Sequence, residues 1–82
     1  MFYFFGCKKL KTIIIPNSVT SIEKFTFFWC YDLKKINIPN SVTFIDENAF
    51  NFCHNICIYC NAGSYAEQYA KENNINFKYL YI

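Results

Sequence analysis

Four residues toward the end of the chain have side chains that can bind metal ions, namely Cys53, His54, Cys57 and Cys60. Their Cys-x3-Cys-x2-Cys spacing is one with which thiolates hold an iron–sulfur cluster, and an imidazole can complete a zinc site. Spacing alone is weak evidence, because many cysteines are simply small buried apolar side chains. The segment therefore supports two hypotheses, a metal site and a packing role.

A repeat in the sequence favours the packing role. Cys7, Cys30 and Cys53 are separated by equal intervals of 23 residues, and the first two have no comparable metal-binding neighbours. An extended strand through the last segment would also send Cys57 and Cys60 to opposite faces. We expect no metal ion and no cofactor.

The oxidation state of the cysteines is a separate question. Neighbouring strands lie about 5 Å apart, near the distance that a disulfide requires. The chain has five cysteines, so at least one cannot pair within it. Because the recurring cysteines have the character of packing positions, the sequence favours free thiols, with a disulfide between copies as the alternative.

No other group of residues predicts catalysis. His54 is expected in a solvated loop, with no nucleophile placed to use it as a base. Ser18 and Ser41 lie in Pro-Asn-Ser turns, where a serine hydroxyl usually makes a turn hydrogen bond. Gly6 and Gly63 are too far apart to form a phosphate-binding loop. We expect no enzyme activity.

Composition narrows the function further. The 82 residues allow one small domain, and 22% of them are aromatic, so some rings are expected at the surface. The net charge is +2 with no arginine, which argues against a nucleic-acid partner because the bidentate guanidinium is missing. No apolar run approaches the roughly 20 residues needed to cross a bilayer, so membrane insertion is not expected.

The segment IPNSVT occurs twice, at residues 15–20 and 38–43. Cysteine, leucine, lysine, isoleucine and phenylalanine recur at the same offset. The chain therefore divides into a partial repeat (1–6), two full repeats (7–29 and 30–52), and a last partial repeat with a C-terminal cap (53–82). Copies of this kind stack and bury one shared core, which predicts a single repeat domain over residues 1–82.

Each copy contains an alternating apolar pattern. Ile13 and Ile15, like Ile36 and Ile38 in the next copy, would point to one side of a short strand that ends at a proline. Stacked copies would pair these strands in a parallel sheet. The sequence thus predicts an α/β fold, a short solenoid with a 23-residue period.

The end of the chain predicts a cap. Ile56, Ile58 and Cys60 can form a last strand, and Ser64 with Glu67 forms the sequence signature of a capping box at the start of a helix. The helix should run to about residue 73, with Ala66, Tyr69 and Ala70 on its buried face and with Glu67 and Glu72 capping or solvating it. The segment INFKYLYI then predicts a closing strand.

The repeat resembles the BspA-type leucine-rich repeats. The segments LKTIIIPNSVTSIEKFTFFWC and LKKINIPNSVTFIDENAFNFC match the family pattern at nearly every fixed position, and GSYAEQYAKENNINF is similar to its frequent C-terminal segment. The chain departs from the pattern at Glu23 and Asp46, where the family prefers glycine, and at Thr26, where it prefers alanine.

The resemblance implies a right-handed leucine-rich-repeat solenoid with parallel strands and no catalytic activity. It also implies protein binding and adhesion at a cell surface, as in surface proteins of mucosal bacteria and parasitic protists. The opening residues lack the basic start of a signal peptide, so if the protein is exported, its signal lies outside this chain. An uncapped first repeat, with Phe2, Tyr3, Phe4 and Phe5, is expected to associate with itself or with further repeats.

Two groups of residues are candidates for binding a protein partner. The first lies between the inward isoleucines of the strands: Thr12, Ile14, Lys35 and Asn37. The second is aromatic and occupies positions that vary between copies: Phe25, Phe28, Trp29, Tyr31 and Phe44. The alternatives are a solvated sheet surface for the first group, packing of the outer layer for the second, and a purely structural stacking and capping unit for the whole chain.

Overall fold

The computed structural model describes residues 9–27 and 29–80. Its elements are β1 (Thr12–Ile14), β2 (Ser21–Ile22), β3 (Lys35–Asn37), β4 (Phe44–Ile45), β5 (Cys57–Cys60), α1 (Tyr65–Glu72) and β6 (Asn76–Tyr79). Cys7, Phe28 and the partial repeat at residues 1–6 lie outside the described residues, as do the predictions that concern them.

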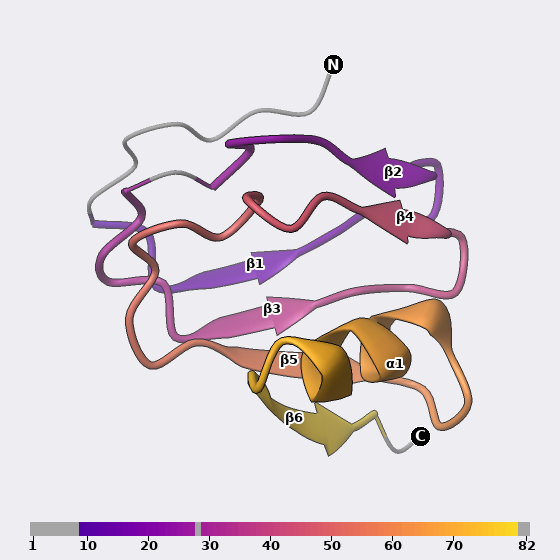
Figure 1. Ribbon diagram of the computed structural model, residues 1–82. Coiled ribbons are helices and arrows are strands. Elements are labelled where there is room, and N and C mark those ends of the chain that lie inside the picture. Colours follow the sequence, from indigo (N-terminus) through magenta and orange to yellow (C-terminus); the bar gives the residue numbers. More distant parts are fainter. Residues whose placement is uncertain (1–8, 28, 81–82) are drawn as a thin grey trace.

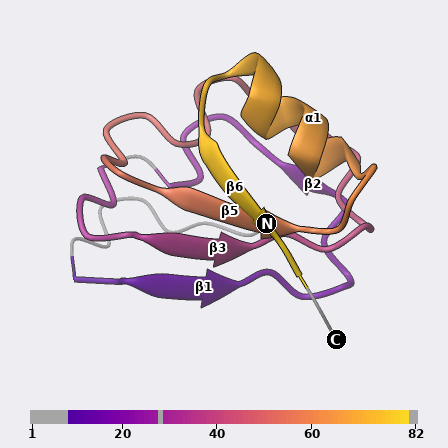
Figure 2. The ribbon, with the colours of Figure 1, turned by 90° about the horizontal axis from the view of Figure 1, so that it is seen from below.

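The described strands form two parallel sheets (Figure 1). The larger sheet has the order β1-β3-β5-β6, and the smaller one pairs β2 with β4. Figure 2 shows the strands of the larger sheet side by side, with α1 at the β5–β6 end. The predicted mixed α/β architecture, with parallel strands in a sheet and one helix, is therefore confirmed.

The repeat places equivalent residues opposite one another. Thr12 pairs with Lys35 and Ser21 pairs with Phe44, so partners in both sheets are 23 residues apart. Ile36 is fully buried while Lys35, its neighbour on the strand, is exposed. This alternation arises because successive side chains of a strand point to opposite faces.

Pro16 follows β1 and Pro39 follows β3, and each proline begins a turn of the chain. The N–H of Val19 donates to the carbonyl oxygen of Pro16 at 3.1 Å, and the N–H of Val42 donates to that of Pro39 at 3.2 Å. The prediction that the Ser41 hydroxyl makes a turn hydrogen bond is wrong. That buried oxygen has no partner in the described part of the chain, because the backbone bond closes the turn without it.

The turns that follow β2 and β4 have the same backbone hydrogen bond, although Glu23, Asp46 and Thr26 depart from the family pattern. The N–H of Thr26 donates to the carbonyl oxygen of Glu23 at 3.2 Å, and the N–H of Ala49 donates to that of Asp46 at 3.0 Å. The Thr26 hydroxyl makes a further bond to the same Glu23 oxygen at 2.7 Å, which satisfies a fully buried polar side chain.

Side chains from both sheets meet in one core. The buried rings of Phe27 and Phe50 are stacked, with centroids 5.2 Å apart and planes inclined by 2°. Tyr69 of α1 extends this column, its ring centroid lying 6.2 Å from that of Phe50. Equivalent phenylalanines thus pack on each other and then on the helix.

The pairing of β5 with β3 departs from the 23-residue offset. Ile36 pairs with Ile58, an offset of 22 residues, because the segment between Cys53 and Ile58 is one residue shorter than the equivalent segment of the preceding copy. The predicted strand through Ile56, Ile58 and Cys60 is present as β5 and begins one residue later than predicted, at Cys57. Its buried residues are Ile58 and Cys60, and Ile56 is buried just before it.

Helix α1 begins as its sequence predicts, with one difference. Ser64 is the N-cap, and its hydroxyl accepts a hydrogen bond from the N–H of Glu67 at 3.2 Å. The reciprocal bond of a capping box would join Glu67 to the N–H of Ser64. Instead, the Glu67 carboxylate accepts from the N–H of Gly63 at 2.6 Å, and the Ser64 N–H is taken by the Asn61 carbonyl oxygen.

The helix ends in a Schellman motif. Asn74 has a φ of 56°, in the left-handed region that asparagine tolerates better than most residues. The N–H of Ile75 donates to the carbonyl oxygen of Ala70 at 2.9 Å, and the N–H of Asn74 donates to that of Lys71 at 3.4 Å. The motif directs the chain back to β6, which pairs with β5 in parallel.

Two tyrosines of α1 complete the edge of the smaller sheet. The Tyr65 hydroxyl accepts a hydrogen bond from the N–H of Ile45 at 3.2 Å, and the Tyr69 hydroxyl donates to the carbonyl oxygen of Asp46 at 3.1 Å. An unpaired strand edge leaves backbone groups without partners. The helix therefore takes the place of a further strand beside β4.

Candidate functional site

The outer face of the larger sheet carries two rows of side chains. The strand registers align Thr12, Lys35, Cys57 and Asn76 in one row, and Ile14, Asn37, Tyr59 and Lys78 in the other. Between the rows lie the buried Ile13, Ile36 and Ile58 and, on β6, the half-buried Phe77, while Ile14 is 72% exposed. The described helix packs against β4, β5 and β6. Of the two rows, Asn37, Cys57 and Tyr59 are half-buried and the other five side chains are exposed.

A groove lies along this face, over β3, β5 and β6. Its volume is about 360 Å³, and its lining consists of Lys34, Lys35, Cys57, Tyr59, Asn76, Phe77 and Lys78. Lys35 also places its Nζ 5.8 Å from the centroid of the Tyr59 ring, a cation–π contact. The lining of the groove therefore combines the aromatic rings of Tyr59 and Phe77 with lysine ammonium groups.

The structure brings the four predicted strand residues to one face. Thr12, Ile14 and Lys35 are exposed, and Asn37 is half-buried beside Tyr59. Of these four, only Lys35 lines the groove.

Sequence reasoning missed four residues of this face: Cys57, Tyr59, Asn76 and Lys78. For Cys57 and Tyr59 a signal was present, since they alternate with the buried residues Ile58 and Cys60 as Thr12 and Ile14 alternate with Ile13. The shortened third copy concealed it, because a strict 23-residue offset does not align Tyr59 with Asn37.

Two of the aromatic candidates lie outside the groove lining. Trp29 and Tyr31 belong to the segment between β2 and β3, and each is 39% exposed. The Trp29 ring lies 6.1 Å from that of Phe52, and the Tyr31 ring stacks on the imidazole of His54 at 6.0 Å. Phe28, another of the aromatic candidates, lies outside the described residues.

Trp29 and Phe52 share an unusual backbone conformation. Their φ values are 63° and 64°, in the left-handed region that bulky residues seldom adopt. The two residues are 23 apart, and the N–H of Trp29 donates to the carbonyl oxygen of Asn51 at 3.0 Å. The turn is therefore a repeated feature of the copies. Of the remaining aromatic candidates, Phe25 is half-buried and Phe44 is exposed on β4.

The cysteines occupy different environments. Cys60 is fully buried and Cys57 lines the groove, so this strand does turn them to opposite faces. Cys53 donates its thiol hydrogen to the carbonyl oxygen of Phe27 at 2.9 Å and lies beside the buried Cys30. Burial raises the pKa of the Cys53 thiol from 9.0 to about 11.

Within residues 9–27 and 29–80, no three side chains of His, Cys, Asp or Glu are placed to share a metal ion. Cys53, Cys57 and Cys60 are free thiols. Cys60 also has a raised pKa, chiefly because it is buried. These environments are those of packing residues, with Cys57 alone at the surface groove.

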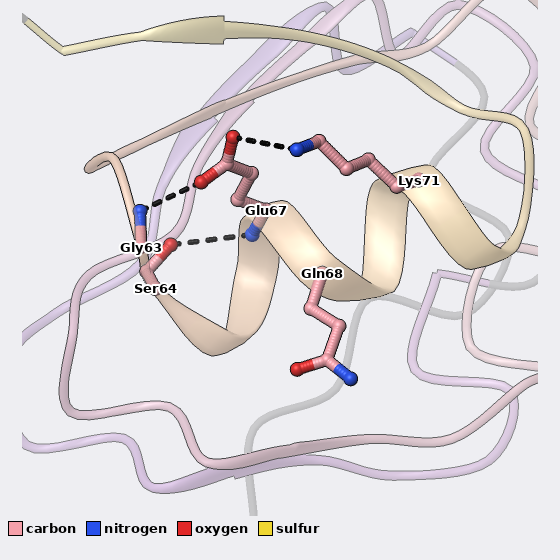
Figure 3. Close-up of a pocket in the computed structure, with 5 residues that line it drawn as sticks. All are labelled: Gly63, Ser64, Glu67, Gln68 and Lys71. Carbon is pink, nitrogen blue, oxygen red and sulfur yellow. Dashed lines mark hydrogen bonds and ion pairs between the residues drawn. The ribbon is translucent and has the colours of Figure 1, made fainter.

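A second hollow, of about 220 Å³, lies at the start of α1 and is lined by Gly63, Ser64, Glu67, Gln68 and Lys71 (Figure 3). In Figure 3 the Glu67 carboxylate points toward Gly63 and Lys71, while Gln68 points away from it. The same carboxylate accepts a hydrogen bond from the Tyr79 hydroxyl at 2.5 Å and forms an ion pair with Lys71 at 3.3 Å. These contacts of Glu67 tie α1 to its own cap and to β6, which indicates a structural role.

Hydrogen bonding fixes the charge of Glu67. The Tyr79 hydroxyl and the Gly63 N–H stabilise its ionised form and lower its pKa below the ordinary value of 4.5, against the opposing effect of burial. The residue is 7% exposed. It is therefore an ionised, satisfied group rather than a proton donor poised for catalysis.

Comparison with known proteins identifies the family of this chain. No helix among the described residues has the length and apolar character that crossing a membrane requires. Searches of curated proteins and of solved structures gave no match. The sequence profile described as the BspA type leucine rich repeat region (6 copies) matches residues 1–82. This match spans the whole chain, and the protein therefore belongs to the BspA type leucine-rich-repeat family.

Proposed function

We propose that this chain is a non-catalytic leucine-rich-repeat module that binds a protein partner through the outer face of its larger sheet. The family is one of repeat modules often used in protein interaction and is generally non-enzymatic. The observation that carries the proposal is the exposed face itself, with a groove of about 360 Å³ over β3, β5 and β6. A concave surface with an aromatic residue and convergent polar groups is typical of a binding site.

The wider context of the module is part of the same proposal. Repeats of this type are typically found at the cell surface or outside the cell, which supports a role within an adhesin-like protein. The proposed architecture is a right-handed solenoid with full repeats at residues 7–29 and 30–52, capped by residues 53–82. The 23-residue pairing of β1 with β3 and of β2 with β4 supports it.

A random peptide library displayed on phage tests the binding function and requires no assumption about the identity of the partner. We expect the immobilised 82-residue chain to select peptides that lose affinity for the variants Lys35→Glu and Asn37→Ala. The control is Gln68→Ala on the exposed side of α1, which should leave binding unchanged. Selected peptides that bind all three variants equally would contradict the proposal and favour a purely structural stacking and capping unit.

The same selection tests the aromatic surface. Trp29→Ala removes an exposed ring that lies 6.1 Å from Phe52 and outside the groove. If the sheet face is the binding surface, this variant should retain the selected peptides. Loss of binding with Trp29→Ala but not with Lys35→Glu would move the site to the aromatic segment.

A further inference from the structure

We propose that the groove over β3, β5 and β6 binds an acidic, extended segment of a partner protein, with carboxylates against the lysines and an apolar side chain on Tyr59. This inference rests on the proposed protein-binding function and names the chemistry of the partner. It depends on the charge of the groove, on the register of its side chains and on the kind of cation that it presents.

The charge of the groove is unbalanced. Its lining contains Lys34, Lys35 and Lys78 and no acidic residue. Within the part of the chain that the structure describes, none of these three lysines forms an ion pair, whereas Lys71 on the helix pairs with Glu67. Like charges gathered on one concave surface raise the local potential and attract an opposite charge. An acidic partner would supply the missing counter-charge.

The register places the lysines on either side of the tyrosine. Tyr59 of β5 pairs with Lys78 of β6, and Lys35 of β3 pairs with Cys57, one row away. Neighbouring strands are about 4.8 Å apart, so β3 and β6 lie roughly 10 Å from each other across β5. In an extended peptide, side chains on one face recur about every 7 Å. The separation of the two lysines falls between one and two such intervals, and their long side chains can make up the difference, so acidic residues two to four positions apart can reach both lysines.

The tyrosine supplies an apolar contact between the charges. Lys35 lies over the Tyr59 ring at 5.8 Å, which holds the ammonium group close to the floor of the groove. A ring buried by a ligand contributes to affinity through the apolar area removed from water. The amide of Asn76 and the thiol of Cys57 add hydrogen-bonding groups to the same lining. The groove thus fits a peptide with mixed acidic and apolar side chains.

The cations of the groove are all lysine ammonium groups. The chain has no arginine, and an ammonium group acts as a point charge without the planar fork that grips phosphate in a bidentate manner. Lysines can meet single carboxylates at various angles. We therefore choose an acidic polypeptide over a nucleic acid or another polyphosphate.

Fluorescence anisotropy with a labelled oligo-glutamate peptide tests this choice on the full chain. We expect saturable binding at low ionic strength that weakens with added salt, and no binding of an oligo-glutamine of the same length. Lys35→Glu and Lys78→Glu should each weaken binding by about tenfold, because each places a like charge against the peptide. Tyr59→Ala should have a smaller effect on this probe, because oligo-glutamate has no apolar side chain to place on the ring.

The matched control is Lys24→Glu. It makes the same change in net charge, but Lys24 is exposed next to β2 and does not line the groove. Circular dichroism of each variant checks that the fold is kept, and Lys35→Gln gives a milder change at the same site. Equal effects of Lys24→Glu and Lys35→Glu would mean diffuse attraction and would overturn the inference.

Two further results separate this inference from the proposed function. Phage-selected peptides that depend on the sheet face but lack acidic residues would overturn the acidic partner and leave the binding function standing. Tighter binding of inorganic polyphosphate than of oligo-glutamate, lost in Lys35→Glu, would also overturn the choice of carboxylate. An acidic bias among face-dependent peptides would support it.

Discussion

Burial controls the ionisation of two side chains on the helix side of the core. It raises the pKa of Cys53 to about 11 and that of Tyr69 to about 12. Both groups are therefore neutral in the folded protein at pH values where they would begin to ionise in the unfolded chain. Their neutral forms donate hydrogen bonds to the carbonyl oxygens of Phe27 and Asp46.

These shifts predict a loss of stability in alkali. Above pH 9.0 the unfolded chain releases the Cys53 proton while the folded state retains it up to about 11, so the free energy of unfolding should fall across this interval. Urea unfolding at a series of pH values measures this slope. Cys53→Ala should reduce the slope between pH 9.0 and about 11. An unchanged slope would show that the thiol is not shielded.

Glu67 predicts the opposite dependence in acid. Its folded-state pKa lies below the ordinary value of 4.5, so its contribution is present above that value and is lost as the pH falls through the lower folded-state pKa. Glu67→Gln should flatten the decline of stability below pH 4.5 relative to the parent protein. Glu72→Gln, on the exposed side of α1, serves as the control and should leave the decline in place.

At the scale of single residues, the sequence was a good guide to type and a poor guide to partners. It predicted that Glu67 caps the helix, but the carboxylate binds the N–H of Gly63 and the hydroxyl of Tyr79, which comes from a different element. Likewise, the predicted turn bond of Ser41 is absent among the described residues. Such bonds depend on how distant segments meet, and local spacing does not contain that information.

At the scale of elements, α1 acts as a cap because its tyrosines satisfy the edge of β4. Tyr69→Phe should lower the free energy of unfolding by about 1 kcal/mol, since it removes one of the hydrogen bonds to the half-buried Asp46 carbonyl oxygen, which still accepts from the N–H of Ala49. Urea denaturation measures the change. Tyr31→Phe, on an exposed ring, should have almost no effect, and equal losses in both variants would contradict the capping role.

The strands of the larger sheet predict a contrast between their two faces. Ile36→Ala should cost about 2 to 5 kcal/mol, because it opens a cavity at a fully buried site between Ile13 and Ile58. Ile14→Ala, at a site that is 72% exposed, should change stability by less than about 0.5 kcal/mol. Similar costs at both positions would mean that the outer face is covered in solution.

The elements themselves were largely predictable from the repeat. The alternation of Ile13 with Ile15 and of Ile36 with Ile38 indicated the strands, and Ser64 with Glu67 indicated the start of the helix. The position of β5 was predicted to within one residue, but its pairing with β3 was not, because one missing residue shifts the offset from 23 to 22 residues. That shift concealed Tyr59, the central ring of the groove.

At the scale of the whole molecule, the family and the α/β class follow from the repeat, while the binding groove does not. The groove forms where β3, β5 and β6 lie side by side, and its lysines come from segments far apart in the sequence. Lys35 begins β3, with Lys34 just before it, but Lys78 lies on β6. The three lysines come together because β5 and β6, which are connected through α1, pair in parallel. The strand β6 therefore contributes to the proposed site.

Nuclear Overhauser contacts in the isotope-labelled chain test the stacking of the copies most directly. Parallel pairing predicts contacts that link Ile13 to Ile36 and Ile36 to Ile58 in one sheet, and Ile22 to Ile45 in the other. Contacts that instead place Thr12 opposite Asn37, as an antiparallel pair of β1 and β3 would, contradict the stacked arrangement and the groove built on it.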